Sequence, residues 1–329
     1  MCANIAIMRL LILGGTLFVG RHLAEAAFER GHAVTLFHRG RTNPAVAPQA
    51  RHVFGDRERD LERLAGERFD WVLDTSGYVP RVVRSAVEAI TAERWCFVSS
   101  ISAYSSLSGP VTEATPLREP EWEREDVDAL YGELKVACER VVLDAYGDRA
   151  LVLRPALVVG PHDPTARFSY WPLRIARGGD VLAPGDAARL VQFVDARDLA
   201  EWTLGLLEAN TGGRLNAASE PVTMGTLLDA CVRVAGTNAR LHWVSDDFLR
   251  AERVGEWQEL PLWLVDPEWG GMMDVHPARV PARPLDDTIR DVLAAEPARA
   301  DNPGAHVGRA GLSPEREAQL LGKLRERLA

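Results

Sequence analysis

The sequence predicts an α/β fold whose centre is a doubly wound parallel sheet. Short apolar runs alternate with helical patterns through the first half of the 329-residue chain, and a glycine-rich turn follows the first apolar run. The runs also lack the alternation of polar residues that half-exposed strands show. Strands joined by helices of this size form right-handed crossovers, and strands covered on both faces are almost wholly apolar.

The expected elements follow one another in a regular order. Apolar runs predict strands at residues 9–13, 33–37, 52–54, 71–74, 94–99 and 151–159. Apolar side chains that recur with the period of a helix predict helices at residues 21–30, 82–90 and 127–145. Farther along, a helix at 199–208 lies between two short apolar runs, 191–194 and 214–216, which we expect to return to the sheet.

The composition of the sequence changes after Gly160, where prolines and aromatic residues become frequent. We therefore expect a sheet domain at residues 1–160, completed by 191–219. Residues 161–190 and 220–329 would form a smaller lobe that binds the substrate. The chain from residue 220 onward looks irregular, apart from a tail at 313–328 that begins Ser-Pro-Glu and continues as an amphipathic helix.

The composition disfavours several classes of partner. The formal net charge is −9, whereas proteins that bind nucleic acids usually carry a basic face. No stretch approaches the ~18 apolar residues of a membrane span. The four cysteines and eight histidines do not fall at metal-ligand spacings. We expect a cytoplasmic protein without a metal site that acts on a small molecule, and the sequence leaves a homodimer open.

The turn at residues 14–20 favours the pyrophosphate of a dinucleotide. Glycines let the backbone approach the phosphates, and the N-terminus of the next helix stabilises their charge. A tight turn that only needs glycine is the alternative interpretation. Leu17 stands where the usual G-x-x-G-x-x-G pattern has its middle glycine. The residues expected around the cofactor in this Rossmann-type domain are Gly14, Thr16, Leu17, Phe18, Gly20, His38, Arg39, Asp56, Arg57, Thr75, Ser76 and Ser99.

The end of the second expected strand bears on the choice of cofactor. A site that prefers NAD carries Asp or Glu about 20 residues past the glycine turn. The sequence here is Phe37-His38-Arg39-Gly40-Arg41, which has no acid. Two arginines suit the 2′-phosphate of NADP better, although a solvated basic loop is the alternative. We expect NADP(H) in preference to NAD(H).

Three hydroxyl- or amine-bearing residues predict a catalytic site. Tyr131 and Lys135 are four residues apart on a predicted helix, which places both on one face. A nearby cation favours the phenolate, so Tyr131 can exchange a proton while hydride moves to or from a nicotinamide. Ser100 ends a strand and can bind the substrate oxygen. Such a pair also occurs by chance, but the glycine turn, the serine and the pair in this order are a strong signal.

The substrate pocket is predicted less sharply. The insertion at 161–190 is rich in aromatic and polar residues, including Arg167, and suits a cyclic, partly polar substrate. Packing in a core is the alternative for most of its aromatic residues. The candidate substrate residues are Tyr78, Tyr104, His162, Phe168, Trp171 and Gln192.

The chain resembles an extended short-chain dehydrogenase/reductase of the NAD-dependent epimerase/dehydratase family. The resemblance rests on Ser100, on Tyr131-x-x-x-Lys135 and on an Arg-Pro…Gly-Pro segment at 154–161. It implies that Ser100, Tyr131 and Lys135 form the catalytic triad, and that Pro155, Leu157 and Val158 line the nicotinamide. The Gly-Gly-Thr-x-Phe-x-Gly turn and residues 310–317 resemble an atypical branch, which includes proteins labelled isoflavone-reductase-like and chloroplast stem-loop RNA-binding-like.

One departure from the family narrows the expected chemistry. Sugar-nucleotide dehydratases of the family have Asp-Glu after the catalytic hydroxyl residue, whereas Ile101-Ser102 follow Ser100 here. Dehydration is therefore disfavoured. We expect an NAD(P)H-dependent reductase, or the reverse dehydrogenase, for a carbonyl, imine or alcohol. A sugar or nucleotide-sugar epimerase that recycles NAD remains open. So does an RNA-binding family member with a vestigial site, against which the net charge and the intact Tyr131 and Lys135 weigh.

Overall fold

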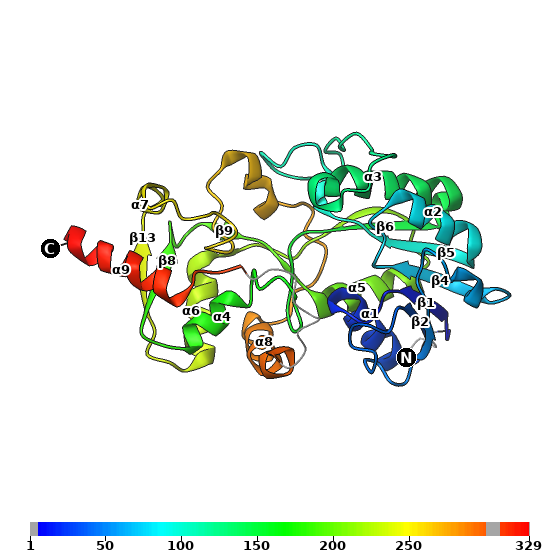
Figure 1. The fold of residues 1–329 in the computed structure, drawn as a ribbon, viewed down its shortest axis with the longest axis horizontal. Helices are drawn as coiled ribbons and strands as arrows, with labels where there is room; N and C mark the ends of the chain where they lie inside the picture. Colours follow the sequence, from blue (N-terminus) through cyan, green and yellow to red (C-terminus); the bar gives the residue numbers. More distant parts are fainter. Residues whose placement is uncertain (1–5, 301–309, 329) are drawn as a thin grey trace.

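The computed structural model of the protein describes residues 6–300 and 310–328. Seven strands form one parallel sheet at one end of an elongated molecule (Figure 1). In spatial order they are β11 (Gly213–Ala217), β6 (Ala150–Pro155), β5 (Thr91–Val98), β4 (Arg68–Asp74), β1 (Arg9–Leu13), β2 (Ala33–His38) and β3 (Arg51–Phe54). The strand order reverses between β4 and β1, and a crevice opens at such a point beyond the carboxyl ends of the strands. The predicted α/β class and the parallel sheet are confirmed.

Helices cover both faces of the sheet (Figure 1). One face packs against α1 (Phe18–Glu29) and α5 (Ala196–Glu208), and the other packs against α2 (Pro80–Ala89) and α3 (Val127–Tyr146). Alternate residues of β1 enter opposite cores, because successive side chains of a strand point to opposite faces. Burial on both faces explains why this strand is apolar throughout.

The strand register brings the candidate functional residues to one edge. Leu13 pairs with Asp74, and Asp74 pairs with Phe97 on the next strand. The glycine turn, Thr75 and the serines after β5 therefore follow strands that end at nearly the same level. The short 3-10 helix η2 (Ile101–Ala103) then turns the chain away from the sheet.

The second lobe has a hydrophobic core of its own. Its strands β8 (Asp180–Pro184) and β13 (Arg240–Val244) pair in parallel. Around them lie α4 (Tyr170–Ala176), α6 (Met224–Ala235), α7 (Asp246–Ala251), α8 (Leu285–Ala300) and α9 (Pro314–Leu328). Further 3-10 turns in the chain are η1 (Leu61–Leu64), η3 (Gly147–Arg149) and η4 (Pro267–Met273). Within the described ranges, no helix combines the length and the apolar character that crossing a membrane requires.

Two local predictions were wrong. The expected strand at 151–159 splits into β6 and β7 (Val158–Val159), since Pro155 has no amide hydrogen with which to continue the ladder. The run at 191–194 does not return to the sheet. Instead β9 (Leu190–Val191) pairs with β12 (Val222–Thr223), and β10 (Val194–Asp195) pairs with β7.

The segment after residue 220 is also more regular than expected. It contains α6, β13, α7 and α8. Leu227, Leu228 and Cys231 recur at helical spacing on α6 and are buried in the core of the second lobe. Prolines and tryptophans are confined mainly to the loops between these elements, and they obscured the periodicity.

Candidate active site

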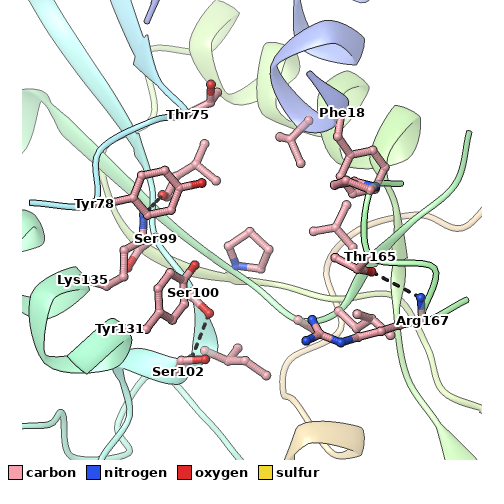
Figure 2. Close-up of a pocket in the computed structure, with 18 of the residues that line it drawn as sticks. Phe18, Thr75, Tyr78, Ser99, Ser100, Ser102, Tyr131, Lys135, Thr165 and Arg167 are labelled. Carbon is pink, nitrogen blue, oxygen red and sulfur yellow. Dashed lines mark hydrogen bonds between the residues drawn. The ribbon is translucent and has the colours of Figure 1, made fainter. Parts of the chain in front are cut away.

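A cleft of about 1200 Å³ runs along the carboxyl edge of the sheet, between the sheet and the second lobe. Figure 2 shows its two sides. We call one side the catalytic wall; it is formed by Tyr78, by residues 98–102 and by Tyr131 and Lys135. We call the opposite side the lobe wall; it is formed by residues of the segments 164–167 and 256–272. The glycine turn lies at one end of the cleft.

The glycine turn forms a backbone cradle. Gly14 and Gly15 have φ angles of 105° and 79°, which glycine adopts without strain. A Cβ atom on Gly20 would lie 2.7 Å from the amide nitrogen of Gly15, so this glycine lets α1 pack directly on the turn. Leu17 caps α1 without a side-chain hydrogen bond, which leaves the helix N-terminus open to a ligand. These features fit a dinucleotide pyrophosphate.

Leu17 replaces a glycine of the family pattern without strain. Its φ of −133° and ψ of 136° are extended, a conformation open to any residue. Its side chain lines the cleft. The turn therefore retains its shape although the middle glycine is missing.

The structure brings all the expected cofactor residues to two adjoining hollows. Most of them line the main cleft. A second pocket of about 330 Å³ shares part of the glycine turn and lies beyond the end of β2. Of the expected residues, His38, Asp56 and Arg57 line this pocket, together with Gly14, Thr16, Arg39 and Ser76, which also line the main cleft.

The charged side chains of the second pocket differ in how they are held. Arg39 is exposed and pairs with no carboxylate among the described residues. Arg57 is drawn inward, because its guanidinium donates to both carboxylate oxygens of Asp74 at 2.8 and 2.9 Å and to Ser76 at 3.0 Å. Arg57 is therefore engaged within the protein, whereas Arg39 and the exposed Arg41, which also lines this pocket, are available to a phosphate group.

His38 is held as a neutral ring. Its Nδ1 accepts a hydrogen bond from the amide of Gly40 at 3.1 Å, and its Nε2 lies 2.9 Å from Nδ1 of His52. Burial and the neighbouring His52 both lower the pKa of His38. The ring therefore orders the loop that carries Arg39 and adds no charge to the pocket.

Ser100 and Tyr131 meet on the catalytic wall. Ser100 caps η2, and its Oγ accepts a hydrogen bond from the amide of Ser102 at 3.1 Å. Tyr131 begins the regular part of α3, because Leu130 has non-helical φ and ψ of −127° and 27°. Burial raises the pKa of Tyr131 to about 12, Tyr78 adds to the rise, and a hydrogen bond with Ser100 opposes it. The phenol is therefore protonated at neutral pH.

Gly132 allows the segment that carries Ser100 and Ser102 to approach α3 closely. A Cβ atom at this position would lie 2.2 Å from the carbonyl oxygen of Ser102. That carbonyl also accepts a hydrogen bond from Nε of Arg118 at 3.0 Å. The segment that carries Ser100 is thus fixed against the helix that carries Tyr131.

Lys135 is buried behind Tyr131, with 2 % of its surface exposed. Its Nζ donates to the carbonyl oxygens of Gly77 at 2.9 Å and Val98 at 2.7 Å. The same atom lies 6.0 Å from the centre of the Tyr131 ring. Burial lowers the pKa of Lys135 to about 8, although Cys138, Asp74 and Glu139 act in the opposite direction. The predicted Tyr-Lys pair does share one helix face.

A buried polar network lies beneath the catalytic wall, and the sequence did not predict it. Glu139, one turn after Lys135, accepts hydrogen bonds from Ser99 Oγ at 2.5 Å and from Arg154 at 2.6 and 3.0 Å. Arg154 also donates to the hydroxyl of Tyr104 at 3.1 Å. The spacing of Glu139 from Lys135 was the available signal. The hydroxyl of Ser99 therefore points into the protein, although the residue lines the cleft.

The prediction of the substrate pocket was largely wrong. Tyr78 lines the cleft. The five candidates absent from the described lining of both hollows are Tyr104, His162, Phe168, Trp171 and Gln192.

Burial explains four of these errors. Tyr104 donates to Asn216 at 2.7 Å within the polar network. Phe168 and Trp171 lie in the core of the second lobe, where Trp171 Nε1 donates to a backbone carbonyl. Gln192 is fully buried and donates to two backbone carbonyls. His162 differs, since it lies outside the cleft with its ring 6.1 Å from that of His22.

The lobe wall combines Arg167, which the sequence placed in the insertion that suits a substrate, with tryptophans that the sequence did not single out. Arg167, Trp257 and Trp269 face the cleft, although the tryptophans resembled packing residues in the sequence. They come from separate loops, so no local spacing links them. Over residues 6–300 and 310–328, no group of three or more His, Cys, Asp or Glu side chains is arranged to hold a metal ion.

Comparison with known proteins identifies a family and several proteins that the chain resembles. The model of the NAD dependent epimerase/dehydratase family matches residues 10–218. The chloroplast stem-loop binding protein of 41 kDa b of Arabidopsis thaliana is 26 % identical over 250 residues, which are 69 % of this chain. The match spans 63 % of that protein's length. The isoflavone-reductase-like branch stays a prediction.

Solved structures share the fold. The UDP-glucuronic acid 4-epimerase from Bacillus cereus in complex with NAD has a TM-score of 0.63 and 16 % identity, over 88 % of this chain and 99 % of that chain. The enzyme WbmH from Bordetella bronchiseptica in complex with NAD+ has a TM-score of 0.63 and 19 % identity, over 88 % and 98 %. The match of the family model covers well over half of the sequence. The chain therefore belongs to the NAD-dependent epimerase/dehydratase family.

Proposed function

We propose that the protein is an NAD(P)(H)-dependent oxidoreductase that reduces a carbonyl or imine of a small metabolite, or oxidises the corresponding alcohol or amine. The observation that carries the proposal is that Tyr131 and Ser100 line one wall of a cleft that also contains the glycine cradle. A phenol in this position serves as the proton donor of a reduction.

The residues of the catalytic wall divide the work. Ser100 donates a hydrogen bond to the substrate oxygen or nitrogen and orients it toward Tyr131. Tyr131 gives its phenolic proton to that atom in the reduction and takes it back in the oxidation. The charge on Lys135 stabilises the phenolate left after proton transfer. The nicotinamide, when bound, supplies or accepts the hydride.

We further propose that NADP(H) is preferred to NAD(H). Arg39 is exposed beside the cradle and has no carboxylate partner among the described residues, which suits a 2′-phosphate. The backbone at Pro155, Leu157 and Val158 lines the cleft and would hold the nicotinamide. The proposed partner is a small molecule and not a nucleic acid, in keeping with the net charge of −9. The homodimer and the cytoplasmic location stay predictions.

A sugar or nucleotide-sugar epimerase is the second candidate. The similarity in fold to nucleotide-sugar epimerases favours it. The same Ser100, Tyr131 and Lys135 would then serve both halves of a redox cycle. An epimerase would retain its dinucleotide through purification and show no net change in its redox state during turnover.

The first experiment is a titration of the purified protein with NADP+ and NAD+, followed by NADPH and NADH absorbance assays with a panel of ketones, aldehydes and cyclic imines. We expect binding of both dinucleotides, tighter for NADP+, and substrate-dependent oxidation of NADPH. Absence of binding by either dinucleotide would falsify the proposal. Tight, salt-sensitive binding of structured RNA in place of dinucleotide binding would instead support the RNA-binding alternative.

A further inference from the structure

Arg167 is a cation in the cleft that the proposed chemistry does not use. Its guanidinium lies over the ring of Trp257, 5.2 Å from the ring centre. It forms no ion pair with any described residue, and its buried Nε has no hydrogen-bond partner. The carboxylate of the nearby Asp163 is engaged through Oδ1 by the amide and hydroxyl of Thr165. Burial lowers the pKa of Arg167, whereas Asp163 raises that pKa electrostatically. Buried polar groups in folded proteins almost always have partners, so the unpaired Nε of Arg167 leaves a donor that a ligand in the cleft could engage.

The position of Arg167 suits a group on the substrate. Its side chain extends from the lobe wall toward the side that carries Ser100 and Tyr131 (Figure 2). Contact with the Trp257 ring restrains the guanidinium at this position. A fixed guanidinium fork binds a carboxylate through two parallel hydrogen bonds.

The other residues of the lobe wall limit how many negative charges a bound ligand can carry there. Leu264, Trp269 and Met272 are apolar or aromatic. The wall also carries the carboxylates of Glu256 and Asp266, which accept backbone amides of their own loop. Arg167 is thus the one cation that the described lining contributes from the lobe, against two anions. One guanidinium can match one carboxylate, whereas Glu256 and Asp266 would repel the additional charge of a diphosphate.

We propose that Arg167 and Trp257 form a subsite for the carboxylate of a monocarboxylic substrate whose body is apolar or aromatic. The inference rests on the proposed function for the reacting end of that substrate, which would lie at Ser100 and Tyr131. The apolar body would lie against Leu264, Trp269 and Met272. Such a subsite suits a monocarboxylate and does not suit the diphosphate of a nucleotide sugar.

The test is a calorimetric titration of the full-length protein with 3-phenylpropionate, its methyl ester and UDP, with and without NADP+. The variants are Arg167→Gln and Arg167→Lys, with Arg177→Gln as the matched control because Arg177 is exposed on the same lobe and does not line the cleft. We expect Arg167→Gln to weaken binding of the acid by about 10- to 100-fold, the scale of charge-assisted hydrogen bonds. Arg167→Lys should be intermediate, and Arg177→Gln unchanged.

The ester should bind weakly and show no dependence on Arg167. Equal affinity for acid and ester, absence of binding by both, or no effect of Arg167→Gln on the acid would overturn the proposal. So would UDP binding that is tighter than that of the acid and depends on Arg167, which would indicate a diphosphate site. Binding of the acid through Arg167 by a protein that binds neither dinucleotide would support the subsite and reject the oxidoreductase.

Discussion

The catalytic wall and the lobe wall hold their charges in opposite ways. On the catalytic wall, Lys135 donates to two carbonyls and the network beneath pairs Glu139 with Arg154. On the lobe wall, Arg167 stacks on Trp257 and pairs with no described carboxylate. The buried charges of the first wall are paired before any ligand binds, whereas the buried Nε of Arg167 on the second wall is an unused donor.

This difference assigns the two walls different tasks. Residues that exchange protons must be held within narrow limits of position, and secondary structure braced by buried hydrogen bonds provides this. Residues that choose a substrate need an unused donor, and loops are free to present one. In the proposed function, α3 and the ends of β4 and β5 would carry the chemistry, and segments 164–167 and 256–272 would select the substrate.

The largest expected effect tests the bracing of the catalytic wall. Arg154→Met leaves the Glu139 carboxylate buried without its partner, so the free energy of unfolding should fall by about 3–5 kcal/mol. Arg189→Met breaks the more exposed ion pair with Asp246 in the second lobe and should cost about 1 kcal/mol or less. Urea denaturation measures both. Similar losses of unfolding free energy in the two variants would show that the Glu139–Arg154 pair stabilises the protein no more than an exposed ion pair.

Substitution of the proton donor separates chemistry from binding. Tyr131→Phe keeps the ring and removes the phenolic proton, so kcat should fall by about 10²-fold or more. Dinucleotide affinity and thermal stability should stay near those of the wild type. Tyr146→Phe is the matched control, since Tyr146 lies on the same helix in the core. Near-normal turnover by Tyr131→Phe would remove Tyr131 from the mechanism.

The cofactor end of the cleft should show a smaller effect. Arg39→Gln removes one of the two exposed cations of this pocket, so the Kd for NADP+ should rise by about 10-fold while that for NAD+ changes little. Arg140→Gln, an exposed position on α3 far along the chain from this loop, serves as the control. Fluorescence titration gives both constants. An equal loss of affinity for the two dinucleotides would show that Arg39 does not read the 2′-phosphate.

The pH dependence should be the mildest effect. Lys135, with a pKa of about 8, is charged below that pH and neutral above it, whereas Tyr131, with a pKa of about 12, stays protonated. The reductive kcat should therefore be flat near neutrality and fall above about pH 8. Lys135→Arg should remove the fall, because a guanidinium keeps its charge. A rate that rises from pH 8 to pH 10 would contradict this role of the cation.

Much of the catalytic wall could be predicted because its signals are local. The i, i+4 spacing of Tyr131 and Lys135 places both on one helix face in any helical context. Ser100 follows a strand whose apolar run marks its end. The glycines of the turn indicate a backbone with positive φ angles, which few other residues adopt. Glu139 continues the same face of α3 but was missed, because its partner Arg154 lies on β6, a separate element.

The lobe wall could not be predicted in this way. Tyr104, Phe168, Trp171 and Gln192 have side chains typical of pockets, yet packing buries them. Residue type does not reveal whether an aromatic or amide side chain faces a core or a cleft, because both environments suit it.

The sequence by itself determined the α/β class, the order of most elements and the local pairing of Tyr131 with Lys135, since these depend on periodicity and short spacing. Only the tertiary structure decided which loops of the second lobe meet the catalytic wall. Arg167 and Trp257 are brought together by packing between distant segments, and that contact has no counterpart in any local pattern.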